Sequence, residues 1–273
     1  VVFGKRAGVL SSLIFRNDKI TFTGKPRIFI FTQRSFISPL PPPDYLKSLC
    51  FKLNKGDSID TVKIADKLTQ IGYIRVPKVN VRGEFSLRGE VLDIFLPDDE
   101  YASRVIFDFD EIQSFKTFDA DNQVTIGSKD DLVIYPMKEV VWTEDFVHTL
   151  DSKLTEYHNT GLQEDTIITD SKVHLRFTEK ALEAKQKLLD ELEICKESEG
   201  EEFFYQLLWN RNYTLLDYIT PQTFVMFYDY DRMVNGQLTI EREYNGMYRK
   251  VKEEFPVFPP SEILENFQNL LEK

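Results

Sequence analysis

The sequence predicts a mixed fold, partly α/β and partly α+β, in which a small β-rich domain is inserted between an α/β segment and a helix-rich segment. Two observations predict this order. Residues 73–137 hold short β-type runs interrupted by glycine and turn residues, whereas the residues after Trp142 follow amphipathic helical patterns. We therefore expect three segments, residues 1–65, 66–141 and 142–273.

The first segment carries the α/β pattern. Residues 27–32 (RIFIFT) form a short continuous apolar run, which is typical of a strand covered on both faces. Pro39 and the prolines at 41–43 then require an extended connector. Apolar residues recur at helical spacing over residues 58–71, and Gly72 follows where a helix commonly ends, so this stretch predicts a helix.

The middle segment is expected to form antiparallel strands, because short apolar runs alternate there with turn residues. Gly83 and Gly89 interrupt the runs, and residues 97–100 close one of them as a turn. The predicted strands are residues 79–81, 85–87, 91–95, 105–109, 115–119 and 132–135.

The last segment is predicted to be mainly helical. Its amphipathic stretches are residues 145–158, 178–194 and 261–271, with one strand at 224–228 after Pro221.

Composition excludes several classes of function. Asp and Glu number 45 against 34 Lys and Arg, a net charge of −11, which disfavours a chain that coats nucleic acid or an anionic membrane. There is no apolar run long enough to span a bilayer. Only Cys50 and Cys195 occur, which fits a reducing compartment such as the cytoplasm.

The chain starts at Val1, which favours a piece of a longer protein; removal of an initiator Met is the alternative.

The sequence shows no motif for nucleotide or zinc chemistry. The three histidines and two cysteines lack metal-ligand spacing. A phosphate-binding loop needs a second glycine five positions upstream of its Gly-Lys pair and a Ser or Thr after the lysine, and neither Gly4-Lys5 nor Gly24-Lys25 meets this pattern.

One acidic cluster has two readings. Asp108, Asp110 and Glu111 could hold Mg²⁺ and support a carboxylate-based hydrolase. The simpler interpretation places them on the polar side of a strand and in its turn, and it is favoured because no phosphate loop or basic substrate clamp accompanies them.

Two arginines are candidate contacts for a partner. In the strand around Phe85, Phe85 and Leu87 share one face while Glu84, Ser86 and Arg88 share the other, so Arg88 is expected to project into solvent. Arg75 follows a predicted helix end and is also expected to be exposed. Arginines fixed on a sheet can clamp a carboxylate of a partner. The alternative is that both are solvated arginines in loose surface ion pairs.

The order of motifs in this region resembles a known family. Its signature here is residues 72–75 (GYIR), 82–97 (RGEFSLRGEVLDIFLP), 104–114 (RVIFDFDEIQS) and 118–119 (FD). This pattern is similar to the UvrA-binding domain shared by the excinuclease subunit UvrB and the transcription-repair coupling factor. Residues 212–230 more weakly resemble the segment that leads into the Walker B strand of that family.

The resemblance implies a partial, degenerate P-loop helicase-like α/β domain interrupted by the UvrA-binding domain. This chain departs from the UvrB pattern: Asp229-Tyr230 stands where UvrB has Asp-Glu, Ser86 stands where UvrB has Arg, and no Walker A motif is present. These departures resemble the N-terminal module of the coupling-factor family, which implies no enzymatic activity and no cofactor in this segment. ATP and Mg are then expected only in the motor of the parent protein.

The implied function is recruitment of UvrA to stalled transcription complexes in the bacterial cytoplasm, with RNA polymerase and DNA bound by other parts of the parent protein and no membrane involved. By match to the family pattern, Arg75 and Arg88 are the first candidate UvrA contacts. Arg82, Glu84, Phe85 and Glu111 are the second. A piece of an ATP-dependent UvrB-like excinuclease subunit is the alternative function.

Overall fold

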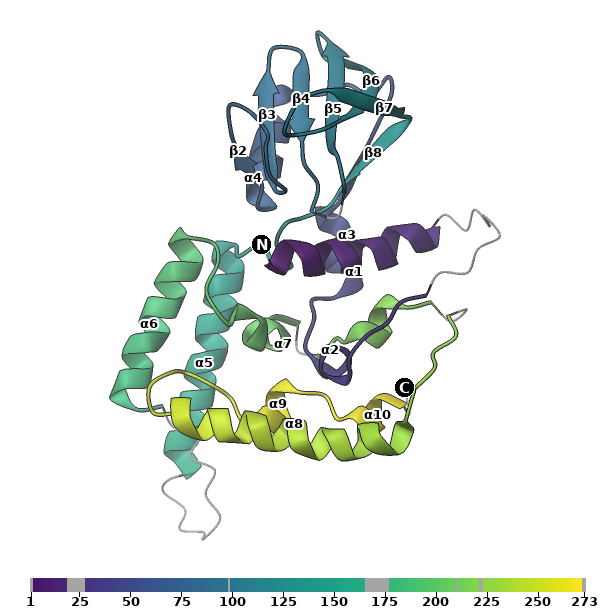
Figure 1. Ribbon diagram of the computed structural model, residues 1–273. Coiled ribbons are helices and arrows are strands. Elements are labelled where there is room, and N and C mark those ends of the chain that lie inside the picture. Colours follow the sequence, from purple (N-terminus) through teal and green to yellow (C-terminus); the bar gives the residue numbers. More distant parts are fainter. Residues whose placement is uncertain are drawn as a thin grey trace. The chain divides into compact units, whose positions relative to one another are not determined.

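The computed structural model describes residues 2–18, 28–97, 99–164, 177–209, 211–220 and 223–271 as a mixed α/β protein. The chain divides into two compact units (Figure 1). The first comprises Val1–Phe22 and Pro43–Val141, and the second comprises Thr23–Pro42 and Trp142–Lys273. Each unit is therefore built from two separate stretches of sequence.

A six-stranded sheet forms most of the first unit, with strand order β2-β3-β4-β5-β6-β7. Neighbouring strands run antiparallel, except that β2 is parallel to β3. A second, antiparallel sheet pairs β1 with β8. The strands are β1 (Phe51–Asn54), β2 (Ile74–Arg75), β3 (Glu84–Arg88), β4 (Val91–Ile94), β5 (Ala102–Asp108), β6 (Glu111–Phe118), β7 (Thr125–Lys129) and β8 (Asp131–Ile134).

Helix α4 (Thr61–Gln70) covers one face of the six-stranded sheet. The Asp60 carboxylate accepts hydrogen bonds from the backbone N–H groups of Val62 and Lys63, which caps the first turn of the helix. Gly72 follows the helix with φ +98°, and a Cβ there would lie 2.8 Å from Cγ of Lys138, so glycine is required at this position.

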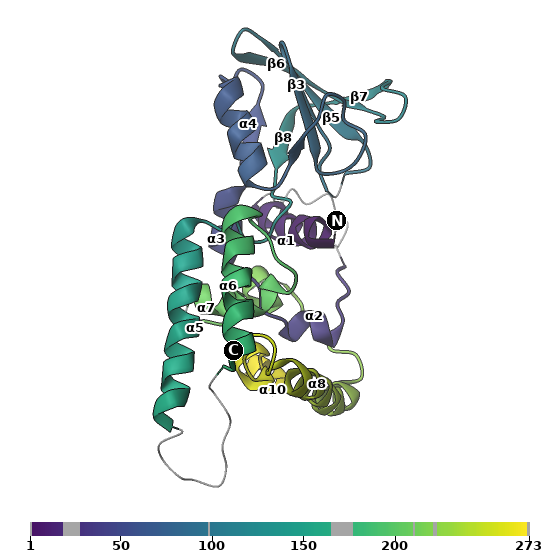
Figure 2. The ribbon, with the colours of Figure 1, turned by 90° about the vertical axis from the view of Figure 1, so that its left-hand side faces the viewer.

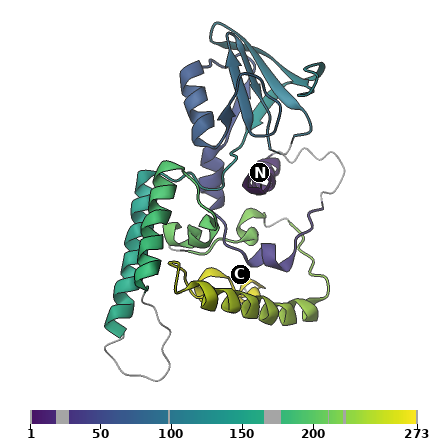
Figure 3. The ribbon, with the colours of Figure 1, turned by 60° about the vertical axis from the view of Figure 1, so that its left-hand side comes forward.

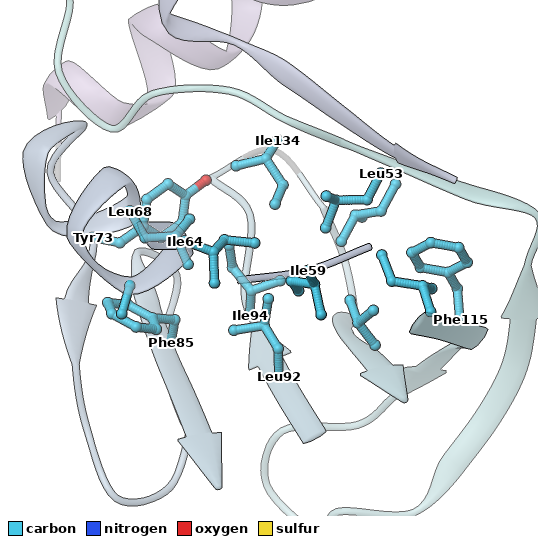
Figure 4. Packing of buried hydrophobic residues seen from close by; sticks show 14 of the residues in the cluster. Leu53, Ile59, Ile64, Leu68, Tyr73, Phe85, Leu92, Ile94, Phe115 and Ile134 are labelled. Carbon is cyan, nitrogen blue, oxygen red and sulfur yellow. The ribbon is translucent and has the colours of Figure 1, made fainter. Parts of the chain in front are cut away.

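The core between α4 and the sheet is apolar and continuous. Ile64 and Leu68 of the helix pack with Phe85, Leu92 and Ile94 of the sheet, as Figure 4 shows. Phe115 of β6 joins the same cluster, as do Leu53 and Ile134 of the two-stranded sheet and Ile59 and Tyr73 of the loops. Because Leu53, Ile59 and Ile64 lie before residue 66, the expected start of the β-rich domain at 66 is too late.

The opposite face of the sheet is partly covered as well. A smaller cluster of Val79, Phe95, Ala102, Phe118 and Ala120 packs there. Ser86 is buried beneath residues 76–81 and donates a hydrogen bond to the carbonyl of Pro77. The expectation that Glu84, Ser86 and Arg88 share a solvent face is therefore wrong for Ser86, because the chain at 76–81 folds back over the strand.

Two more helices, α1 (Val2–Asp18) and α3 (Pro43–Leu49), belong to the first unit. Leu10 and Leu13 of α1 and Leu46 of α3 are buried. Burial also raises the pKa of the Cys50 thiol to about 11, so this cysteine stays a thiol at neutral pH.

The second unit is mainly helical. Figure 2 and Figure 3 show α5 and α6 side by side, and Lys185 of α6 donates a 2.7 Å hydrogen bond to Thr155 of α5. Phe36, Phe227 and Phe267 pack edge to face elsewhere in this unit. The helices are α2 (Gln33–Ile37), α5 (Glu144–Glu164), α6 (Glu179–Ile194), α7 (Tyr205–Trp209), α8 (Tyr230–Val251), α9 (Pro260–Ile263) and α10 (Phe267–Leu271), with 3₁₀ turns η1 (Glu201–Phe204) and η2 (Leu215–Tyr218).

Several sequence predictions of secondary structure are wrong. Residues 28–32 and 223–228 form no strand, and Ile28, Ile30, Phe224 and Met226 are exposed; position 27 lies outside the described residues. Residues 79–81 are irregular, and the predicted helix at 261–271 is divided into α9 and α10. None of the helices in the described part of the chain is long and apolar enough to cross a membrane.

Candidate protein-interaction surface

A buried carboxylate lies between two arginines on the sheet face opposite α4. Asp93 of β4 pairs with Arg104 of β5 in the sheet register, and its side chain is 1% exposed. Arg104 donates to both carboxylate oxygens, from Nε at 2.6 Å and from Nη2 at 2.9 Å. Nη2 of Arg88 lies 3.6 Å from Oδ2 of the same carboxylate. One negative charge therefore faces two positive charges.

The two arginines differ in how firmly they are held. The guanidinium of Arg104 lies 4.5 Å from the centre of the Phe118 ring, and the hydrogen bonds from Arg104 to Asp93 raise its pKa further above the ordinary value. Arg88 stands at the end of β3 with a side chain that is 58% exposed. Arg88 thus pairs with Asp93 while more than half of its side chain remains exposed to a partner.

Arg75 lies at the β2 edge of the sheet, and its side chain is exposed. In the register Arg75 is opposite Phe85, and Arg88 lies three residues further along β3, which is about 10 Å. Because side chains alternate between the faces of a sheet, Arg75 and Arg88 are on opposite faces. The structure does not bring these two arginines into one cluster, but a partner that covers the β2 edge could reach both.

Arg82 and Glu84 organise the loops at the other end of β3. Nε of Arg82 donates to the carbonyl of Asp99 at 3.0 Å, and its guanidinium lies 5.1 Å from the centre of the Phe95 ring. Oε2 of Glu84 accepts from the backbone N–H groups of Asn80 and Val81, at 2.8 and 3.0 Å. Both side chains are engaged in holding the 80–83 turn, so a contact role for them requires that a partner touches this turn.

Phe85 and Glu111 occupy very different environments. Phe85 is 0% exposed and packs in the apolar core, so the expectation that its side chain contacts UvrA is wrong. Glu111 begins β6 and is exposed, opposite Asp108 across the β5–β6 hairpin. Glu111 therefore remains a surface candidate, and Phe85 is a core residue.

The acidic cluster at this hairpin is not arranged as a metal centre. Asp110 accepts a hydrogen bond from Oγ of Ser58, and Asp108 and Glu111 are paired strand residues. Within the residues that the structure describes, no group of three His, Cys, Asp or Glu side chains could hold a metal ion. As in the simpler interpretation, Asp108 is a strand residue and Asp110 lies in the turn that follows it.

Asp229 and Tyr230, at the degenerate Walker B position, lie in the second unit where α8 begins. Both are exposed, and Asp229 has φ 58° without capping the helix through its side chain. The residues before them form no strand, so the predicted strand that would lead into this position is absent from the described residues 223–228.

The Asp93–Arg104 pair was missed in the sequence because its members are 11 residues apart. A signal was present: Asp93 interrupts an otherwise apolar run from Val91 to Phe95. A charged residue inside a buried strand requires a partner of opposite charge, and Arg104 is the basic residue on the next strand.

Residues 51–140 match the family model of the UvrB interaction domain. The match begins at β1 and ends after β8, and so contains both sheets and α4.

Curated relatives extend the similarity beyond this segment. The chain is 28% identical over 209 residues to the transcription-repair-coupling factor of Borreliella burgdorferi, covering 74% of this chain and 16% of the relative. It is 28% identical over 257 residues to UvrABC system protein B of Thermotoga neapolitana, covering 90% and 35%. The coupling factor of Rickettsia typhi is 31% identical over 140 residues, covering 51% and 12%. The chain thus spans between about an eighth and about a third of the length of these relatives.

Proposed function

We propose that this chain is the N-terminal, UvrB-like module of a transcription-repair coupling factor, and that residues 51–140 bind UvrA. By this binding the module recruits UvrA to stalled transcription complexes for nucleotide excision repair. The observation that carries the proposal is Arg88: it is exposed, it is oriented by a buried carboxylate, and it lies in the segment that matches the UvrB interaction domain.

The arrangement around Asp93 suits recognition of an acidic group. Arg104 donates two hydrogen bonds to Asp93 and largely compensates its negative charge. The positive charge of Arg88 therefore remains available to a partner. Because the ion pair with Asp93 restricts the Arg88 side chain in part, Arg88 loses less conformational entropy on binding than an unpaired arginine would. Arg88 would then form a bidentate pair with a carboxylate on UvrA, and Arg75 would bind a second acidic group across the β2 edge.

The module is proposed to have no ATPase activity of its own. The sequence lacks a Walker A motif, and Tyr230 stands where a water-orienting glutamate would be needed. ATP and Mg would be used by a motor elsewhere in the parent protein, which would also carry the contacts to RNA polymerase and DNA.

A piece of an ATP-dependent UvrB-like subunit is the second candidate function. It is favoured by coverage, because the UvrB relative aligns with 90% of this chain against 74% for the first coupling factor. Nucleotide hydrolysis by the intact parent protein that is lost on substitution of Asp229 would favour this candidate over the coupling factor.

Binding to purified UvrA tests the proposal, with Kd measured by calorimetry for the full chain and for Arg88→Ala and Arg75→Ala. Truncation of a desolvated charged anchor is expected to cost about 2 kcal/mol, or about 30-fold in Kd. Lys63→Ala is the matched control, since it removes an exposed cation from α4. If the double variant at Arg75 and Arg88 binds UvrA as tightly as the unsubstituted chain, the assignment of these residues is wrong.

A further inference from the structure

Phe109 combines two features that a residue without a function rarely has. Its side chain is 85% exposed, although phenylalanine is among the most apolar residues. Its backbone has φ 56°, in the left-handed region, where bulky side chains are outliers. Exposure and backbone strain each disfavour Phe at this position.

The hairpin geometry shows which residue the fold alone would prefer. β5 ends at Asp108 and β6 begins at Glu111, so Phe109 and Asp110 are the two residues of the connection. Two-residue hairpins place a positive φ at their first central residue, and glycine or asparagine is favoured there. Phe109 therefore stands where glycine would relieve strain and remove an exposed apolar ring.

The turn that presents the Phe109 ring is held from both sides. The backbone N–H of Phe109 donates to Oε1 of Glu90 at 3.2 Å, which links it to the β3–β4 turn. On the other side, the carbonyl of Asp110 accepts from the N–H of Ile59 at 2.6 Å, and its carboxylate accepts from Ser58 at 3.1 Å. The backbone at Phe109 is thus held in place, which lowers the backbone entropy lost when a partner buries the ring.

The charged residues around Phe109 indicate the chemistry of the surface that it would contact. Four exposed carboxylates surround the hairpin tip: Glu90, Asp108, Asp110 and Glu111. Such a ring of negative charge repels the phosphates of nucleic acid and of anionic lipid. It is complementary to an apolar socket on a protein that is rimmed by Lys or Arg.

The tip is continuous with the Arg88 surface. In an antiparallel succession of strands the β3–β4 and β5–β6 turns lie at the same end of the sheet, and Arg88 is the last residue of β3 before the first of these turns. A partner that contacts Arg88 therefore comes close to Phe109.

We propose that Phe109 is an aromatic anchor that inserts into a basic-rimmed apolar socket on UvrA, beside the contact of Arg88. This inference rests on the proposed binding of UvrA. The carboxylates around Phe109 are negative and Arg88 is positive. Contacts of both kinds together fix the orientation in which the domain docks.

The test compares Phe109→Gly, Phe109→Asn and Phe109→Tyr in the full chain, with UvrA affinity and thermal midpoint measured for each. Gly and Asn tolerate the left-handed backbone, so both variants are expected to raise the midpoint by about 2–4 °C while weakening UvrA binding at least about tenfold. Phe109→Tyr keeps both ring and strain and should bind nearly as the unsubstituted chain does. Ile126→Ser, at an exposed apolar residue on β7, is the control and should leave affinity unchanged.

The outcomes separate this inference from the proposed function. If the unsubstituted chain binds UvrA and Phe109→Gly binds it equally well, the anchor is wrong and UvrA recruitment stands. A fall in the midpoint of both Phe109→Gly and Phe109→Asn would show that the ring is structural, which also overturns the anchor. If the unsubstituted chain does not bind UvrA, the proposed function fails, and the anchor fails with it.

Discussion

One face of the six-stranded sheet packs against α4 through apolar side chains, whereas the other face buries the carboxylate of Asp93 between Arg104 and Arg88. Strand β3 contributes to both, because Phe85 and Arg88 lie three residues apart and therefore on opposite faces. Phe85 is fully buried, and Arg88 is mostly exposed.

The difference separates stability from recognition. An apolar face gains free energy from burial, about 25 cal/mol per Å², and has no preferred partner outside the fold. A buried ion pair adds little net stability, because desolvation of the charges offsets their attraction, but it fixes the direction of the side chains that form it. We therefore expect substitutions on the α4 face to change folding and substitutions at Arg88 to change binding.

The largest expected effect is on the α4 face. Phe85→Ala removes a fully buried ring from the centre of the core and should destabilise the protein by about 3–5 kcal/mol. Urea unfolding followed by circular dichroism measures this loss. A change below about 1 kcal/mol would mean that the core at Phe85 is not packed as described.

Asp93→Ala is expected to have the next largest effect, about 3 kcal/mol, because it leaves the partly buried guanidinium of Arg104 without its bidentate acceptor. A double-mutant cycle with Arg104→Ala isolates the interaction between the two side chains. Additive losses in that cycle would contradict the coupling. The same Asp93 variant should also weaken UvrA binding, since Arg88 loses the carboxylate that orients it.

Arg88→Ala reverses the pattern of Phe85→Ala. Its ion pair with Asp93 is long and largely solvated, so the loss in stability should be under about 1 kcal/mol, while UvrA binding falls by about 2 kcal/mol. Unfolding and calorimetry on the same preparation check both values. A loss of stability as large as that of Phe85→Ala would remove the distinction between the two faces.

The two faces also differ in how well the sequence predicts them. The strands containing Phe85, Leu92, Val105 and Phe115 were predicted because alternation and turn residues are local signals. The cover over Ser86 was not, because it depends on the chain at 76–81 folding back across the sheet. Phe109 was predicted as the end of a strand, since hydrophobicity alone does not show that its backbone turns.

The strand predictions for residues 28–32 and 224–228 were wrong for a related reason. Their apolar runs are typical of buried strands, but a strand needs neighbours to pair with, and pairing partners far along the chain leave no local signal. The exposure of Arg88 at a strand end was predictable from local alternation, whereas the contact of Asp93 with Arg104 was not, because it depends on how two strands pair.

The smallest expected effect is a pH dependence on the α4 side. The hydrogen bond from the backbone N–H of Lys63, the nearby Lys63 ammonium and the N–H of Val62 lower the pKa of the Asp60 carboxyl in the folded protein. The carboxylate therefore stabilises the fold at pH values above its unfolded pKa of 3.8, and this contribution is lost as pH falls through the lower folded pKa. Asp60→Ala should lower the urea midpoint at neutral pH, and the difference from the unsubstituted chain should shrink below about pH 4.

Asp60→Asn keeps an acceptor for the helix cap without the charge, so it separates the two contributions of Asp60. Its midpoint should lie between those of the unsubstituted chain and Asp60→Ala at neutral pH, and it should approach the unsubstituted chain in acid, where the Asp60 carboxyl is also uncharged. If the midpoints of Asp60→Asn and the unsubstituted chain differ by a constant amount across this pH range, the charge of Asp60 does not stabilise the fold. The hydrogen bonds of the cap would then account for the whole effect of Asp60.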